Sequence, residues 1–315
     1  MINKDYLYTD IYNNVSDIEI RENSTYIYAV DNEIRSRLCE KLSDTQKKNI
    51  HFIEIALIDD YRIKINGSEG RAYSLWDDQE INDLFSLCRE DTVYLDVSGM
   101  NNRISASFIR YFRDNNEKEL IIIYVEPRYY SLELFKKAGI HNDLSESIEG
   151  INPLPGLASI ISDDESDVLF IPILGFEGGR FTYLLEQISE PNMEIMPIVG
   201  VPGYRIEYPF DSIWGNRRPL LDTQAWRNIR YSAANSITDI FFILDNIYKH
   251  NKNRIIKVAP IGTKPHAIGA ILFAFMHQDN VELIYDNPIR KIGRTEGIGR
   301  IVICNVTRLI SENKR

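Results

Sequence analysis

The sequence predicts an α/β protein made of two Rossmann-like halves with mostly parallel sheets, related by internal duplication. Short runs of β-branched and aromatic residues alternate with amphipathic stretches, which is the pattern of strands joined by crossover helices. This alternation occurs twice along 315 residues, a length that accommodates about two domains. Features of residues 92–127 also recur at 254–290.

The first half is expected to span residues 1–150. Its strands are predicted at 25–30, 51–58, 92–97 and 119–125, its helices at 33–42, 79–88 and 103–113, and a hairpin-like insertion at 61–65. The pattern then loosens, and prolines and a glycine follow at Pro153, Pro155 and Gly156. Such residues are typical of connectors, so the boundary is placed near 150.

The second half is expected to span residues 151–315 and to repeat the same order of elements. Its strands are predicted at 167–174, 193–201, 254–260, 281–286 and 301–306, and its helices at 179–188, 226–249 and 265–276. Pro172 and Pro197 conflict with two of these strands because proline cannot donate to a strand ladder. We therefore expect bulges or strand ends at both prolines.

The duplication is predicted from residues as well as from element order. The run 92–99, a helix and the run 119–128 match the run 254–262, a helix and the run 281–290, with Gly99 and Gly262 as the paired turn residues. The alternative interpretation is that any two βαβ units look alike at this level of detail.

Composition limits the classes of partner. The formal net charge is −10 and the pI is near 5.1, whereas proteins that bind long nucleic acids concentrate Lys and Arg to displace counterions. No apolar run approaches the roughly 18–20 residues that cross a bilayer. We expect a cytoplasmic protein with neither long nucleic acid nor membrane as its partner.

Cysteine and histidine usage argues against disulfides and metals. Cys39, Cys88 and Cys304 lie far apart, so reduced thiols are expected. The histidines show none of the spacings that zinc sites use. The sequence also lacks the dinucleotide fingerprint and the Walker A loop. No metal and no cofactor are expected.

A glycine-rich loop follows the predicted strand 167–174. Gly175, Gly178 and Gly179 would let the backbone approach a ligand beside Phe176, and Arg180 would supply a bidentate contact to phosphate or carboxylate. The carboxyl ends of parallel strands are where ligands collect in such sheets. The alternative is a tight turn with a surface arginine.

A second loop of interest follows the predicted strand 254–260. Gly262 makes the turn, Thr263 is able to cap the next helix, and Lys264 adds positive charge, which together predict a small anion site. The alternative is an ordinary helix cap.

The turn Gly262-Thr263-Lys264, followed by an apolar helix with Gly269 and Ala270, resembles the ligand-binding turn of CARF domains. These are Rossmann-like sensors of cyclic oligoadenylates in CRISPR-linked defence. In that family the turn is usually Gly-Gly-Thr-Lys, and Ile261 stands here in place of the first glycine. The resemblance implies a sensor that pairs two similar domains, as CARF homodimers and the related SAVED sensors do.

Two further segments carry candidate residues. Asp96 closes the strand of the first half that corresponds to 254–260 and is a candidate base or helix cap. Near the C-terminus, Tyr285, Arg290 and Gly297 belong to a glycine-containing stretch in which positive charge gathers. That stretch predicts either a focused anion site or a hairpin with solubilising charge.

The segment 202–226 is predicted to be a long loop rich in Tyr, Trp, Pro and Gly. Tyr204 and Asn216 are its candidate ligand-binding residues, since aromatic rings beside arginines are suited to stacking a base and pairing its phosphate. The same residue types also form protein interfaces.

Three functions are weighed from these features. The first is binding of a nucleotide-like or phosphorylated small molecule by a sensor or regulatory subunit, for which the CARF resemblance implies a prokaryotic defence system as the setting. The second is an enzyme on a nucleotide or sugar phosphate with Asp96, Glu177 or Glu296 as the proton acceptor. The third is an interaction subunit of a multi-gene system that uses loop 202–226. Whether the chain is an enzyme is left open.

Overall fold

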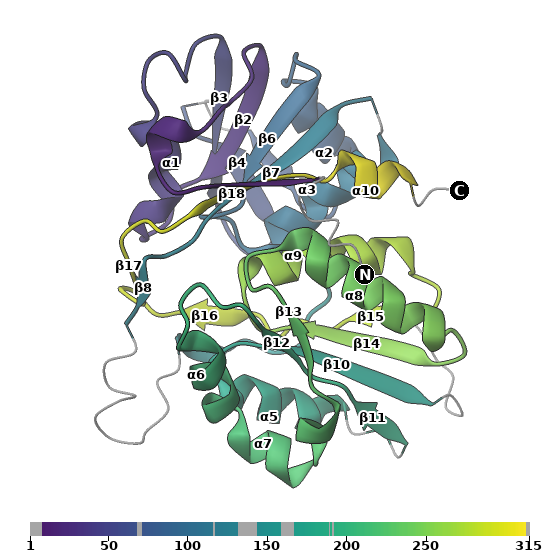
Figure 1. Cartoon of the computed structure of the whole chain (residues 1–315). Coiled ribbons are helices and arrows are strands. Elements are labelled where there is room, and N and C mark those ends of the chain that lie inside the picture. Colours follow the sequence, from purple (N-terminus) through teal and green to yellow (C-terminus); the bar gives the residue numbers. More distant parts are fainter. Residues whose placement is uncertain are drawn as a thin grey trace. The chain divides into compact units, whose positions relative to one another are not determined.

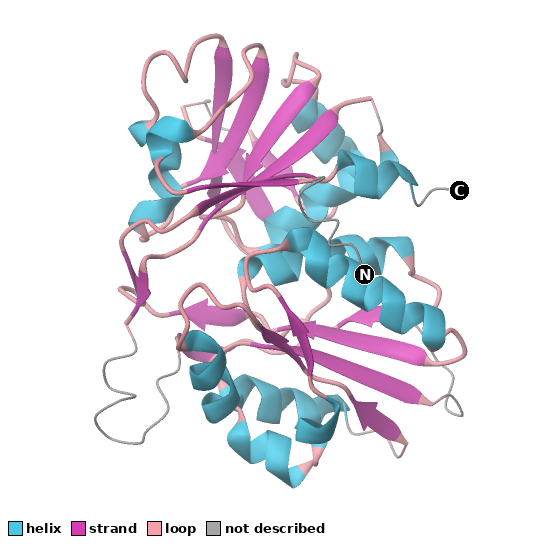
Figure 2. Cartoon of the chain, in the orientation of Figure 1, coloured by secondary structure: helices cyan, strands magenta, loops and turns pink. Residues whose placement is uncertain are grey.

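A computed structural model describes residues 8–67, 71–115, 117–131, 144–158, 167–188, 190 and 192–312. These residues form two compact units, each built around its own β-sheet (Figures 1 and 2). The terminal unit comprises 8–130 and 295–312, and the central unit comprises 131–294. The fold is mixed α/β.

The two units are therefore not two consecutive segments of the chain. The expected halves, 1–150 and 151–315, assign residues 295–315 to the second half. In the structure β18 (Ile301–Asn305) instead pairs with β7 (Glu119–Val125), a strand of the terminal unit. The chain passes from the terminal to the central unit after Tyr130 and returns after Arg294.

The terminal unit has a mixed sheet in the order β1-β18-β7-β6-β2-β3-β4-β5, with a parallel centre and antiparallel edges. Its strands are β1 (Thr9–Tyr12), β2 (Ser24–Ala29), β3 (Ile50–Leu57), β4 (Arg62–Ile65), β5 (Ala72–Ser74), β6 (Thr92–Asp96), β7 and β18, and β8 (Tyr129–Tyr130) pairs with β17 (Thr295–Glu296). Its helices are η2 (Val15–Asp17), η3 (Ile34–Arg37), α1 (Leu38–Lys41), α2 (Asp78–Phe85), α3 (Asn102–Asp114) and α10 (Thr307–Glu312).

The central unit has a wholly parallel sheet in the order β13-β12-β10-β14-β15, with β11 also beside β10. Its strands are β10 (Val168–Leu174), β11 (Met193–Ile195), β12 (Ile198–Gly200), β13 (Arg230–Ser232), β14 (Ile255–Pro260) and β15 (Val281–Leu283), and β9 (Ser145–Ile148) pairs with β16 (Pro288–Arg290). Its helices are α5 (Gly178–Ile188), α6 (Tyr208–Gly215), α7 (Arg217–Asp222), η4 (Ala225–Asn228), α8 (Ile237–His250) and α9 (Lys264–Met276).

Helices cover both faces of the central sheet. In Figures 1 and 2, α8 and α9 pack together on one face, while α5 and α7 lie on the other. Every residue of β10 is buried, because a central parallel strand is covered on both sides. Phe170 of β10 packs against Phe181 of α5 in the core of this unit. None of the described helices is long and apolar enough to cross a membrane.

The two prolines that conflict with the predicted strands are explained by one break. Pro197 separates β11 from β12, so residues 193–201 form two short strands instead of one. β10 pairs with β11 through residues 168–170 and with β12 through residues 173–174. Pro172 therefore lies opposite the break between β11 and β12, where no ladder hydrogen bond from its backbone nitrogen is needed.

Other predicted elements differ in their limits. The helix expected at 226–249 begins only at Ile237, because residues 230–232 form β13 and Ser236 caps the helix through the backbone N–H of Asp239. The helix expected at 33–42 is a 3-10 turn followed by the short α1. Segment 202–226 is not a continuous loop, since it contains α6 and α7.

The same strand order occurs in both units. The terminal unit contains the parallel run β3-β2-β6-β7, and the central unit contains the parallel run β12-β10-β14-β15. In each run the strand that comes earliest in the sequence, β2 or β10, lies in the second position. The helices after β6 and β14, α3 and α9, each have 13 residues.

Candidate functional site

The loops after β10 and β14 meet at the centre of the central sheet's carboxyl edge. β10 and β14 are neighbours, and the helices that follow them, α5 and α9, lie on opposite faces of the sheet (Figure 1). Open parallel sheets bind ligands at such a position. A Cβ on Gly175 would lie 2.7 Å from the carbonyl oxygen of Ile261, and one on Gly262 would lie 2.8 Å from that of Leu174. Both positions need glycine because the two backbones are in contact.

Arg180 holds these loops together from inside the protein. Its Nε and Nη2 donate to Asp286 Oδ2 and Oδ1 at 2.7 and 2.5 Å, and its Nη1 donates to the carbonyl of Ile261 at 3.2 Å. Burial opposes the charge of Arg180, but the hydrogen bonds and charge of Asp286 raise its pKa above the ordinary value. The guanidinium that was predicted to contact a ligand is thus occupied by an internal carboxylate.

Glu177 is part of the same buried network. Its Oε1 accepts a hydrogen bond from the backbone N–H of Ser145 at 2.8 Å, and Oε2 lies 3.5 Å from Arg180 Nη1. This arrangement fixes β9 to the glycine-rich loop. Such a carboxylate is better suited to bracing the loop than to taking a proton from a substrate.

The glycine-rich loop also packs tightly against α6. A Cβ on Gly178 would lie 2.2 Å from the carbonyl oxygen of Gly215. Ser212 Oγ and Asn216 Nδ2 both donate to the carbonyl of Gly175, at 2.8 and 2.7 Å. Asn216 Oδ1 is buried without a hydrogen-bond partner among the described residues. Two separately predicted segments, 174–180 and 202–226, therefore lie together.

Thr263 and Lys264 begin α9 at this edge. Thr263 Oγ1 caps the helix by accepting from the backbone N–H of His266 at 3.5 Å, and donates to the carbonyl of Ala234 at 2.6 Å. Lys264 is the first residue of α9 and is buried. Its charge therefore lies at the positive end of a helix dipole.

His266 is fully buried beneath the same turn. Its Nε2 donates to the carbonyl of Ala233 at 2.9 Å, while Nδ1 has no hydrogen-bond partner within the described part of the chain. Burial lowers the pKa of His266 to about 4, although the Ala233 carbonyl acts in the opposite direction. The ring is neutral at physiological pH.

The remaining candidates divide between the two units. In the central unit, Gly179 lies in the first turn of α5, Tyr285 is buried beside Asp286, and Arg290 lies in β16. The ring centroid of Phe176 lies 5.2 Å from that of Tyr208, in the segment that also contains Tyr204. Glu296 and Gly297 belong to the terminal unit. The predicted positive cluster at 290–300 is thus split, and Arg300 pairs with Glu126 at 2.9 Å.

Asp96 lies at the corresponding place in the terminal sheet. Its Oδ2 accepts from the hydroxyl of Tyr26 at 2.8 Å, and its Oδ1 accepts from the backbone N–H of Ser98 at 2.9 Å. A Cβ on Gly99 would lie 1.9 Å from the carbonyl oxygen of Ala29. Asp96 is buried and fully engaged in holding the turn.

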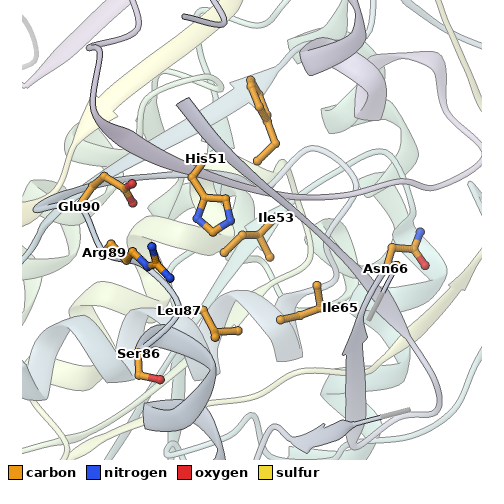
Figure 3. A pocket seen from close by; sticks show the side chains of 10 residues that line it. His51, Ile53, Ile65, Asn66, Ser86, Leu87, Arg89 and Glu90 are labelled. Carbon is orange, nitrogen blue, oxygen red and sulfur yellow. The ribbon is translucent and has the colours of Figure 1, made fainter. Parts of the chain in front are cut away.

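A groove of about 660 Å³ lies elsewhere in the terminal unit (Figure 3). Strand β3, the end of β4 and the residues after α2 form it, at the opposite edge of the sheet from Asp96. Its lining residues are His51, Phe52, Ile53, Ile65, Asn66, Gly67, Ser86, Leu87, Arg89 and Glu90. These residues carry no recognisable signal in the sequence, because none follows the carboxyl end of a parallel strand.

No group of three or more His, Cys, Asp or Glu side chains able to hold a metal ion occurs in the described ranges. Cys39, Cys88 and Cys304 are buried free thiols. Comparison with protein-family models and with curated proteins yields no match to this chain.

Proposed function

We propose that the chain binds a nucleotide-like or phosphorylated small molecule at the carboxyl edge of the central sheet. This proposal is carried by one observation: the loops after β10 and β14 meet at the topological switch point of the sheet, where the strand order changes direction. The start of α9 lies at this same point. Helix starts of this kind bind anions because their N–H groups and dipole favour negative charge.

Lys264 supports an anionic ligand. Lys264 is buried at the start of α9, so its charge and the positive end of the helix dipole lie together at this edge. A phosphate beside both would interact favourably with each of them. Since Arg180 is held by Asp286, we assign the main charged contact to Lys264 and give Arg180 the role of fixing the loops.

The aromatic segment supplies a surface for a base or similar ring. Phe176 and Tyr208 are in edge contact beside the glycine-rich loop, and Tyr204 is half-buried in the same segment. Stacking on aromatic rings is a sequence-tolerant way of holding nucleobases. A nucleotide therefore fits this edge better than inorganic phosphate alone.

We further propose that the two units arose by duplication and are Rossmann-like. The strand runs β3-β2-β6-β7 and β12-β10-β14-β15 match. Gly99, which follows β6, lies against Ala29 of β2, and Gly262, which follows β14, lies against Leu174 of β10. Asn101 and Thr263 then cap helices of equal length. With the resemblance of the turn 262–264 to CARF domains, this supports a sensor or regulatory subunit, with cyclic oligoadenylates as a ligand class and antiviral defence as its setting.

Thermal unfolding with a nucleotide panel tests the proposal. We expect AMP, ATP or a cyclic oligoadenylate to raise the melting temperature, since a ligand that binds only the folded state stabilises it. Lys264→Gln should remove the shift, whereas Lys252→Gln, at an exposed lysine, should keep it. No shift with any of these compounds, or an equal shift in Lys264→Gln, would contradict the proposal.

Protein interaction is a second candidate function, favoured by one observation. Ile206, Phe210, Trp214 and Leu221 are 88%, 72%, 53% and 62% exposed. Phe210 and Trp214 lie four residues apart in α6, while Ile206 precedes α6 and Leu221 lies in α7. Arg217 stacks 4.4 Å over the Trp214 ring. Large exposed apolar residues with Trp and Arg among them are typical of interface centres. The enzyme alternative remains a prediction.

We take a second copy of this chain as the partner of this face. Glu207 precedes the apolar pair Phe210 and Trp214, and Arg218 follows it. Packing two copies antiparallel about a twofold axis would bring Glu207 of one copy toward Arg218 of the other. Within one chain Glu207 pairs with Arg205, and Arg218 lies 3.7 Å from Asp222, so the contacts across the twofold axis would extend these two ion pairs.

Sedimentation velocity tests this second function. We expect self-association that Trp214→Ser abolishes and that Glu207→Arg or Arg218→Glu weakens, with recovery in the double charge exchange. The exposed Arg37→Gln in the terminal unit serves as control. A wild-type monomer at high concentration, or single exchanges without effect, would contradict the self-association.

A further inference from the structure

The groove of the terminal unit combines an apolar floor with charged walls. Ile53 is buried at its base, and Ile65 and Leu87 line it, with Leu87 still 41% exposed. Figure 3 shows these side chains together with the ring of His51, the guanidinium of Arg89 and the carboxylate of Glu90. Its volume of about 660 Å³ falls in the range of small-molecule sites, roughly 300–1,000 Å³.

Most polar groups of the groove already have partners. Asn66 Nδ2 donates to Glu54 Oε1 at 2.5 Å, and Ser86 Oγ donates to the carbonyl of Asp83 at 2.6 Å. Arg89 differs, because its guanidinium makes no ion pair or hydrogen bond with any described residue. Within the described part of the chain, a cation with its donors unused therefore lies on the wall of a groove with an apolar floor.

Glu90 supplies the opposite charge. Its Oε2 accepts a hydrogen bond from the hydroxyl of Thr25, which holds the pKa of Glu90 below its usual range. Glu90 is thus ionised at neutral pH and does not pair with its neighbour Arg89. The groove presents one positive and one negative group, separately, over an apolar floor.

We infer that this groove binds a free α-amino acid with an apolar, preferably aromatic, side chain. Its carboxylate would pair with Arg89 and its ammonium with Glu90, while the side chain covers Ile65 and Leu87. A molecule with a single negative charge satisfies Arg89 but is repelled by Glu90. A zwitterion of this kind is complementary to both groups and to the floor.

Four compounds that share a phenyl ring separate these contributions in isothermal titration calorimetry on the full chain. Phenylalanine has both charges, 3-phenylpropanoate lacks the ammonium, phenethylamine lacks the carboxylate, and 2-phenylethanol lacks both. We expect phenylalanine to bind about tenfold more tightly than either singly charged compound, since one charge-assisted hydrogen bond is worth about that much. 2-Phenylethanol should be the weakest.

Two variants test the assignment of each charge. Arg89→Gln should remove the preference for phenylalanine over phenethylamine but retain the preference for phenylalanine over 3-phenylpropanoate. Glu90→Gln should remove the preference over 3-phenylpropanoate but retain the preference over phenethylamine. Gln at position 90 retains an acceptor for Thr25, so the fold is kept, which thermal unfolding will check. Arg37→Gln and Glu40→Gln, at an exposed pair of the same unit, are the matched controls.

The inference is independent of ligand binding in the central unit. It is overturned if phenylalanine does not bind at millimolar concentration. It is equally overturned if 3-phenylpropanoate or phenethylamine binds as tightly as phenylalanine, or if the preferences persist in Arg89→Gln and Glu90→Gln.

Discussion

Arg180 and Asp286 form a bidentate ion pair, 106 positions apart in sequence, that is buried at the carboxyl edge of the central sheet. The same guanidinium donates to the carbonyl of Ile261. One side chain thus connects the segments that follow β10, β14 and β15. This network sets the shape of the edge at which we propose that a ligand binds.

Breaking this pair should destabilise the central unit strongly. Asp286→Asn would leave the buried charge of Arg180 with Glu177, 3.5 Å from its Nη1, as its remaining counter-ion. Because removal of one partner of a buried pair costs about 3–5 kcal/mol, we expect a loss toward the lower end of that range. Urea unfolding should show a large fall in the free energy of unfolding. Glu194→Gln, which breaks an ion pair with Arg254 at a more exposed position, should cost less than about 1 kcal/mol. Equal effects of the two variants would argue against the bracing role.

The two turn glycines should tolerate alanine differently. A methyl at Gly99 would lie 1.9 Å from the carbonyl oxygen of Ala29, whereas at Gly262 the nearest atom, Leu174 O, is 2.8 Å away. Backbone atoms cannot move aside easily, and overpacking typically costs about 1–3 kcal/mol. We expect Gly262→Ala to fall in this range and Gly99→Ala to exceed it in urea unfolding. The reverse order would show that the terminal turn adapts more readily than its contacts indicate.

Local pattern was sufficient to predict the strands that form the centre of each sheet. β7 and β10 are largely apolar runs because both strands lie inside their sheets and are buried on both faces. The turn glycines Gly99 and Gly262 could be located in a similar way, since they lie just beyond the ends of β6 and β14. Pro197 signalled a strand end, although the interpretation that Pro172 lies opposite that end needed the pairing of β10 with its neighbours.

Long-range pairing could not be predicted in this way. The strand at 301–306 was recognised, but its pairing with β7, which joins the C-terminal residues to the terminal unit, depends on contacts across about half the chain. The role of Arg180 was missed for the same reason, because its partner Asp286 belongs to a distant loop. The groove beside Arg89 also escaped notice, since its walls come from three elements with ordinary local patterns.

The cap of α9 should contribute measurably to stability. Thr263→Val keeps the shape of the side chain but removes both the acceptor for the backbone N–H of His266 and the donor to Ala234. Loss of an N-cap costs about 0.5–2 kcal/mol, and an unsatisfied carbonyl adds to it. Urea unfolding should therefore show a loss near the upper end of that range. Thr263→Ser, which retains the hydroxyl, should stay close to wild type, and a loss as large as that in Thr263→Val would contradict the assignment.

His266 should make the protein less stable in mild acid. Burial lowers its pKa to about 4 in the folded state from about 6.5 in the unfolded chain, so the unfolded state takes up a proton first as the pH falls. The contribution of His266 is complete above pH 6.5 and is lost progressively as the pH falls to about 4. The full difference amounts to about 3 kcal/mol.

Urea unfolding at pH 7.5 and 4.5 measures this loss. His266→Gln should lose less stability between the two pH values than wild type, because glutamine does not titrate, while its amide can still donate to the carbonyl of Ala233. The exposed His250→Gln should lose as much as wild type. His277, whose pKa burial also lowers, acts in the same direction but is present in all three proteins. The same loss in His266→Gln as in wild type would mean that the ring is protonated, or reaches water, in the folded protein.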